Sequence, residues 1–219
     1  MVKQLVVLGD SFCHGVGTVS PFKNPENTQY AFGKYIAEAL NLEYVNLAEP
    51  GTSITRAVEV GYNYLSKNKD NIELVIIGWT HPSRIGFYSD TAMLQILPQY
   101  VLLGDSADDD VFVSTDANVK FITDKNNQAH LSMLPQIHKI MVGNNFLESQ
   151  LSVSQVSAEC FRSWLRENNI KYCDFNVFPG GVTGANCSVT FEDIMKPTRH
   201  PTKEEQQKFA NLLLSKIND

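Results

Sequence analysis

The chain has 219 residues, of which 43% are hydrophobic and 19% charged, the balance of an ordinary globular protein long enough to bury a sizeable core. Its formal net charge of −6, with no cluster of Lys or Arg, argues against a nucleic-acid-binding surface, which needs a basic face. No apolar run approaches the roughly 20 residues that cross a membrane. We therefore expect one globular domain over residues 1–219 that binds neither nucleic acid nor membrane.

The spacing of the four cysteines fits neither a CxxC pair nor a set of metal ligands. We interpret them as reduced cysteines of a cytosolic protein without a metal site. The first predicted strand begins almost at the first residue, which leaves no room for a signal peptide. Both observations predict a cytoplasmic location.

Residues 5–8 form a short apolar run that breaks into Gly9-Asp10-Ser11. Such a run is typical of a buried strand. Ser11 then follows the carboxyl end of that strand, where open α/β sheets bind their ligands. A serine in this position can act as a nucleophile if a histidine from elsewhere in the chain reaches it. The alternative is ordinary loop chemistry, in which Gly turns, Asp caps and Ser is solvated.

The loop that follows, residues 12–17, is rich in glycine but matches neither of two common nucleotide-binding motifs. Ser20 stands where a dinucleotide fingerprint has its third glycine, and no Gly-Lys-Ser/Thr of a P-loop follows. His14 and Asp10 flank Ser11 and are candidates for substrate binding. A solvated loop histidine is the alternative for His14.

The next elements alternate between helix and strand. A turn-rich stretch over 18–28 precedes a helix at about 28–41, a strand at 43–47 and a helix near 53–67 that Thr52 or Ser53 caps. The strand at 71–78 is apolar enough to be central and parallel. It ends in Trp79, Thr80 and His81, which either line a site or pack within a loop.

Residues from about 82 to 130 are the least regular and predict an insertion with a hairpin formed by 111–114 and 118–122. Arg84, followed by two aromatic residues, either lines a substrate pocket or packs in the loop. A helical pattern over 131–168, with a break near 149–152, leads to a strand at 170–177.

The C-terminal segment places His200 just before a helix. Thr202 and Glu205 have the spacing of a capping box, which predicts a helix to about residue 217. Asp193, seven residues before His200, is a candidate for orienting the imidazole. Glu192, or a backbone carbonyl in a simple Ser–His dyad, are the alternatives.

The first block, Val7-Leu8-Gly9-Asp10-Ser11, and the final His200-Pro201 resemble the opening and closing blocks of the GDSL/SGNH hydrolases, which are serine esterases and acylhydrolases. The resemblance runs in block order through Ser11, Gly51, Gly78 and His200. It implies an α/β fold of three α/β/α layers, flavodoxin-like, with a mainly parallel central sheet.

The same resemblance implies a set of roles. Ser11 would be the nucleophile and His200 the base, and the backbone N–H groups of Ser11 and Gly51 would hold the oxyanion. A glycine at position 51 allows close backbone approach to the developing charge, although a plain strand-to-helix turn also explains it.

Two positions depart from the family pattern. Thr80 stands where the family has an asparagine that donates to the oxyanion; a threonine hydroxyl can donate one hydrogen bond. Loss of such a donor typically costs ~10²–10³ in rate. Pro197 stands where the family has the aspartate that orients the histidine.

The resemblance therefore predicts an ester hydrolase that needs no cofactor and acts on a small-molecule or carbohydrate ester, with deacetylation of a carbohydrate as one option. The two departures motivate an alternative: a protein of the same fold that binds ligands with little or no turnover. An O-acyltransferase with the same nucleophile is a nearer variant. The sequence indicates neither the substrate nor the oligomeric state.

Overall fold

The computed structural model describes residues 2–20, 24–82, 85–89, 92–96, 146–195 and 199–217. The predicted hairpin at 111–122 and Arg84 lie outside these ranges.

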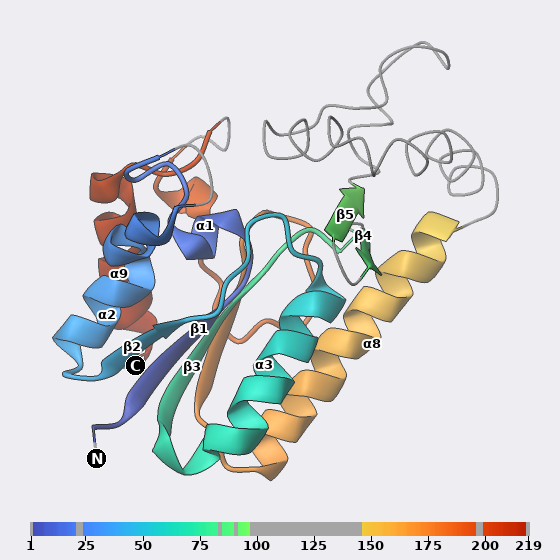
Figure 1. Cartoon of the computed structure of the whole chain (residues 1–219), viewed down its shortest axis with the longest axis horizontal. Helices are drawn as coiled ribbons and strands as arrows, with labels where there is room; N and C mark the ends of the chain where they lie inside the picture. The colour runs from blue at the N-terminus through green and yellow to red at the C-terminus, as the bar shows by residue number, and fades with distance from the viewer. Residues whose placement is uncertain are drawn as a thin grey trace.

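Four parallel strands form the central sheet, in the order β2-β1-β3-β6 (Figure 1). Their bounds are Gln4–Leu8 for β1, Glu43–Asn46 for β2, Ile72–Trp79 for β3 and Tyr172–Asn176 for β6. The central strands β1 and β3 are almost wholly buried, as their unbroken apolar runs require. The parallel sheet expected from the sequence is thus confirmed.

Helices cover both faces of this sheet. Helices α2 (Phe32–Ala39) and α9 (Lys203–Ile217) lie on one face, and α3 (Ile54–Asn68) and α8 (Phe146–Glu167) on the other (Figure 1). Alternate residues of β1 serve the two sides, because successive strand side chains point to opposite faces. Leu5 and Val7 join the core under α2 and α9, whereas Val6 and Leu8 join the core under α3 and α8. The predicted α/β/α layering is confirmed.

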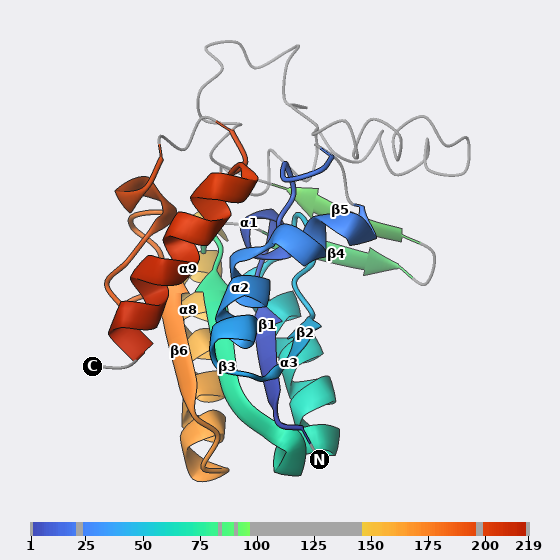
Figure 2. The same cartoon turned by 90° about the vertical axis from the view of Figure 1, so that its left-hand side faces the viewer.

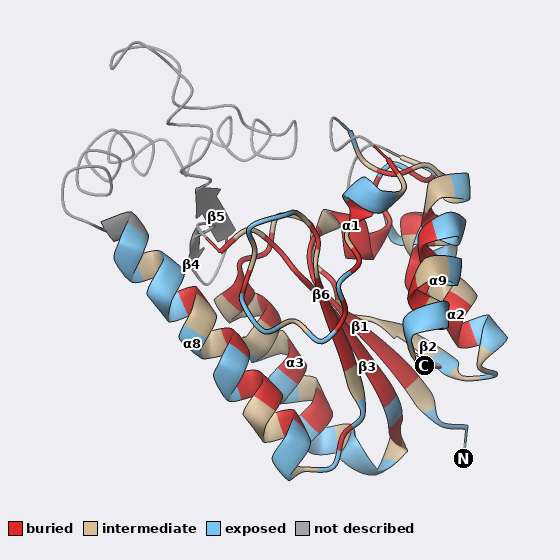
Figure 3. Cartoon of the chain, turned by 180° about the vertical axis from the view of Figure 1, so that it is seen from behind, coloured by how far each residue is buried: buried red, intermediate tan, exposed pale blue. Residues whose placement is uncertain are grey.

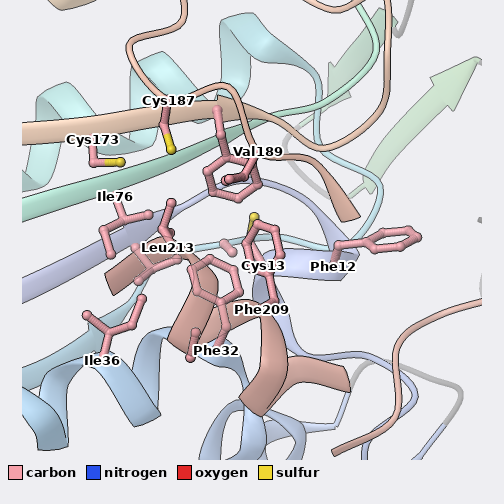
Figure 4. Close-up of a cluster of buried hydrophobic side chains, with 14 of the residues drawn as sticks. Phe12, Cys13, Phe32, Ile36, Ile76, Cys173, Cys187, Val189, Phe209 and Leu213 are labelled. Atoms are coloured by element: carbon pink, nitrogen blue, oxygen red, sulfur yellow. The ribbon is translucent and has the colours of Figure 1, made fainter. Parts of the chain in front are cut away.

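The core under α2 and α9 is aromatic and extends to the turn that carries Ser11. Phe191 and Phe209 stack with ring centroids 4.0 Å apart, and Phe32 meets Phe209 edge-on at 5.2 Å. Phe12, the neighbour of Ser11, is part of the same cluster (Figure 4). It packs edge-on against Phe191 at 5.2 Å. The turn that carries Ser11 is therefore continuous with the hydrophobic core.

The single helix predicted at 28–41 is wrong in its first part. Residues Pro25–Tyr30 form a 3-10 helix, η1, and α2 begins only at Phe32. Asn24 caps η1 through the Glu26 N–H, and Pro25 occupies its first turn. Ala31 adopts an extended conformation between the two elements, which breaks the helical run.

The break predicted near 149–152 is also wrong, because α8 runs without interruption over that stretch. Two serines of this helix use their hydroxyl groups differently. The Ser152 hydroxyl donates to the Glu148 carbonyl at 3.0 Å, one turn earlier. The buried Ser154 hydroxyl instead donates to the Pro82 carbonyl at 2.7 Å and ties α8 to the loop after β3.

Two further strands, β4 (Ile85–Ser89) and β5 (Ala92–Ile96), pair as an antiparallel hairpin within the predicted insertion (Figure 2). This hairpin was not expected from the sequence. In the described part of the chain, no helix is long and apolar enough to cross a membrane.

Candidate active site

Ser11 lies at the carboxyl edge of the sheet, just after β1. The sheet grows from β1 to β2 on one side and to β3 on the other, so the direction of the strand order changes at this point. Gly9 leaves β1 with φ +144°, and Asp10 caps the one-turn helix α1 (Ser11–His14) by accepting the Phe12 N–H at 3.0 Å. A Cβ atom on Gly9 would lie 2.5 Å from Cys13 Sγ and 2.8 Å from the Gly78 carbonyl. Only glycine fits this turn, which sets Ser11 at the crevice where such sheets bind ligands.

His200 reaches Ser11 from the other end of the chain. Its Nε2 atom lies 2.9 Å from Ser11 Oγ, although the residues are 189 positions apart. With Nε2 unprotonated, the serine hydroxyl donates to the imidazole, which is the arrangement an activated serine needs. The structure therefore brings together the two residues that carried the resemblance.

The backbone around His200 is held by an ion pair. The Arg199 guanidinium donates to the His200 carbonyl at 2.9 Å and binds both carboxylate oxygens of Glu205, at 2.7 and 2.8 Å. This guanidinium lowers the pKa of Glu205 to about 2. Glu205 also accepts the Thr202 N–H at 2.8 Å, which confirms the predicted capping box at the start of α9.

A tight loop supports His200 from the side. A Cβ atom on Gly17 would lie only 2.7 Å from His200 Cβ. The loop therefore passes directly against the backbone and Cβ atom of His200. The buried Asn27 shapes that loop, accepting the N–H groups of Val19 and Ser20 at 3.0 and 2.9 Å.

Asp193 does not contact His200. Its carboxylate accepts the Thr190 N–H at 2.6 Å and caps the 3-10 helix η4 (Phe191–Asp193), a local role typical of an aspartate at this position. Both Asp193 and Glu192 are exposed. Pro197 lies outside the described residues. The structure thus gives Asp193 a capping function, not the orienting one expected from the sequence.

Thr80 and Gly51 follow the carboxyl ends of β3 and β2 at the same edge of the sheet. The Thr80 hydroxyl is buried and has no hydrogen-bond partner among the described residues. Gly51 has φ +80°, and no acceptor for its N–H is found within the described ranges. Ser11 is the first residue of α1, and first-turn N–H groups have no intrahelical acceptor. None of these three groups therefore has an acceptor among the described residues.

Trp79 belongs to the core and not to a substrate pocket. It is 1% exposed, and its indole N–H donates to the buried Asp174 carboxylate at 2.6 Å. Arg162 pairs with the same carboxylate at 2.7 Å and lies over the Trp79 ring. This buried ion pair was not expected from the sequence, and it anchors the end of β3 just before Thr80.

The other expected substrate-binding residues have different positions. His14 is buried in α1, and Asp10 is fully buried as its cap. His81 is partly exposed directly after Thr80. No described group of three or more His, Cys, Asp or Glu side chains is placed to hold a metal ion.

Two amide side chains hold this region together, and the second of them, Gln206, was not expected from the sequence. Asn46 at the end of β2 donates to the Cys13 carbonyl at 3.2 Å and accepts the Ala48 N–H at 2.9 Å. Gln206 on α9 is fully buried and bonds to α1 and α2. A signal existed for Gln206, since it shares the apolar helix face of Phe209, Ala210 and Leu213.

No family model and no curated protein matches the sequence. The chain is similar to solved structures at low identity. A lipolytic protein of the G-D-S-L family from Desulfitobacterium hafniense DCB-2 is 15% identical, with a TM-score of 0.40 over 98% of this chain and 99% of that one. The psychrotrophic esterase EstA from Pseudoalteromonas sp. is 14% identical, with a TM-score of 0.39 over 99% and 97%. A carbohydrate esterase family 2 enzyme from Corynascus thermopiles is 14% identical, with a TM-score of 0.40 over 98% and 65%.

Proposed function

We propose that this chain is a serine-dependent ester hydrolase with Ser11 as nucleophile and His200 as base. The single observation that carries the proposal is the 2.9 Å contact between Ser11 Oγ and His200 Nε2 at the carboxyl edge of a parallel sheet. That distance lies within the hydrogen-bond reach a general base needs to take a nucleophile's proton.

The reaction follows from these two groups. Ser11 Oγ attacks the ester carbonyl carbon while its proton passes to His200 Nε2, and the carbonyl oxygen takes up the displaced electron pair. The C–O bond to the alcohol then breaks, and the imidazolium returns its proton to the leaving oxygen. A water molecule, deprotonated by His200, attacks the acyl-Ser11 ester, which releases the acid and restores the serine.

The oxyanion is held by the donors that have no internal partner. The N–H groups of Ser11 and Gly51 and the Thr80 hydroxyl supply these hydrogen bonds. Thr80 would replace the asparagine with one neutral donor, a hydroxyl whose reach is one bond shorter than that of the amide. Thr80→Val keeps the shape and removes the donor, so we expect kcat to fall about 10²-fold.

The first experiment is intact-mass labelling with a fluorophosphonate. We expect one adduct on the native chain, none on Ser11→Ala, and strongly slowed labelling on His200→Ala. Ser215→Ala, which removes an exposed serine on α9, is the matched control and should label normally. Labelling of Ser11→Ala would contradict the proposal.

Acetylated sugars and small aryl esters are the substrates to test next, since both fit the proposed chemistry. Absence of any adduct, together with ligand binding without turnover, would favour the non-catalytic alternative. The capping role of Asp193 is the observation that favours it, because that carboxylate bonds to Thr190 and not to His200.

A further inference from the structure

Gln206 is a polar side chain with no access to solvent, and both ends of its amide are used. Its Oε1 accepts the Phe32 N–H at 2.9 Å, and its Nε2 donates to the Phe12 carbonyl at 2.9 Å. Phe32 is the first residue of α2 and Phe12 the second residue of α1, and both rings are part of the core in Figure 4. One amide therefore joins three helices.

Two of these helices position the proposed dyad, because Ser11 lies on α1 and His200 just precedes α9. Phe12 is bonded directly to Ser11, and α1 is a single turn, which is too short to be stable by itself. His200 lies six residues before Gln206, next to the first turn of α9. A shift of α9 relative to α1 would change the distance between Ser11 Oγ and His200 Nε2.

The His200 ring also meets α1 directly, with its centroid 5.2 Å from that of Phe12, but a ring contact sets position less sharply than a hydrogen bond does. The Arg199–Glu205 ion pair acts within the segment that carries the base, and Arg199 is 52% exposed. It shapes the His200 backbone without reaching α1. Gln206 is the side chain that bonds from α9 to the nucleophile's helix.

We propose that Gln206 is a positioning residue that sets the Ser11–His200 contact from behind the site. The inference rests on the proposed function, because it assigns the residue a role in that same dyad. Gln206 touches neither the substrate nor the reacting atoms; it acts through the Phe12 carbonyl and the start of α9.

The test compares Gln206→Met with Gln207→Met, its exposed neighbour on the same helix. Methionine keeps the volume of glutamine and removes both hydrogen bonds. We expect kcat on an aryl acetate and the fluorophosphonate labelling rate to fall about 10- to 100-fold for Gln206→Met, since a displacement of about 1 Å can cost that much. KM should change less than about threefold, and Gln207→Met should match the native chain.

Gln206→Glu is the second variant, because it keeps the shape and adds a readout in pH. A protonated carboxyl can donate to Phe12 and accept from Phe32, whereas a carboxylate can only accept. Its activity should approach the native value at the acidic end of the profile and fall selectively as pH rises. A purely structural residue would lower the melting temperature without this additional ionisation in kcat.

The outcomes separate the two proposals. If Ser11→Ala still forms the adduct, the proposed function fails, whatever the Gln206 variants do. If Ser11→Ala abolishes the adduct while folded Gln206→Met and Gln206→Glu keep native kcat and pH profile, the positioning role is overturned and the hydrolase stands.

Discussion

Ser11 and His200 meet at 2.9 Å, but the chain fixes them by different means. Ser11 is held in place by close packing. Gly9 fits against Cys13 and the Gly78 backbone, and α1 is almost wholly buried at the end of the strands (Figure 3). The histidine side combines one ring contact, with Phe12 at 5.2 Å between centroids, with an ion pair in which Arg199 is half exposed.

Because of this difference, substitutions near Ser11 should mainly affect the stability of the fold, and substitutions near His200 should mainly affect activity. The packing that fixes Ser11 also stabilises the sheet, so a substitution there should destabilise the whole fold. Apart from Phe12, the segments beside His200 are exposed at Gly17 and Arg199, where a change moves the imidazole and leaves most of the core in place. Substitutions on the two sides should therefore give different phenotypes.

The largest effect is expected for Gly9→Ala on the serine side. The added Cβ meets Cys13 Sγ and the Gly78 carbonyl, and alanine is strained at φ +144°. Strain and overpacking together should lower the free energy of unfolding by about 3 kcal/mol, measured by urea denaturation. Gly180→Ala is the control, with φ +72° and open space around the Cβ; it should cost about 1 kcal/mol. Equal losses for the two variants would refute the packing argument.

Gly17→Ala should damage activity more than stability. Its Cβ would meet His200 Cβ at 2.7 Å, so the base has to move, whereas the core is untouched. We expect kcat to fall about 10-fold or more. Gly184→Ala controls for backbone strain, since it has φ +74° and its nearest neighbour is at 3.5 Å. Both variants should lose similar unfolding free energy, about 1 kcal/mol. Retention of native kcat by Gly17→Ala would show that the loop does not position His200.

The features that the sequence predicted correctly are those that depend on residues close together in the chain. Apolar runs identified β1 and β3, and the capping residues Ser53, Thr202 and Glu205 located the starts of α3 and α9. The pairing of Ser11 with His200 came from the family resemblance and not from periodicity, because nothing local links residues 189 positions apart.

What the sequence could not predict depends on partners distant in the chain. Trp79 reads as a loop aromatic until Asp174, 95 residues away, accepts its indole N–H. Asp193 reads as a candidate for orienting His200 until its carboxylate is found capping η4. Gln206 is one polar residue on an apolar face, and only the folded chain shows which groups it satisfies.

The smallest effect concerns the ion pair beside His200 and depends on pH. Arg199 lowers the pKa of Glu205 from 4.5 to about 2, so the pair's contribution is complete above about pH 4.5 and is lost as pH falls through about 2. Because Arg199 is 52% exposed, Glu205→Gln should cost less than about 1 kcal/mol of unfolding free energy at pH 7. The gap between native chain and variant, followed by urea denaturation, should narrow below pH 4.5 and close near pH 2. Glu73→Gln, at an exposed position of β3, is the matched control and should show no such narrowing. A gap that stays constant down to pH 2 would assign the loss to the capping geometry of α9 and not to the charge of Glu205.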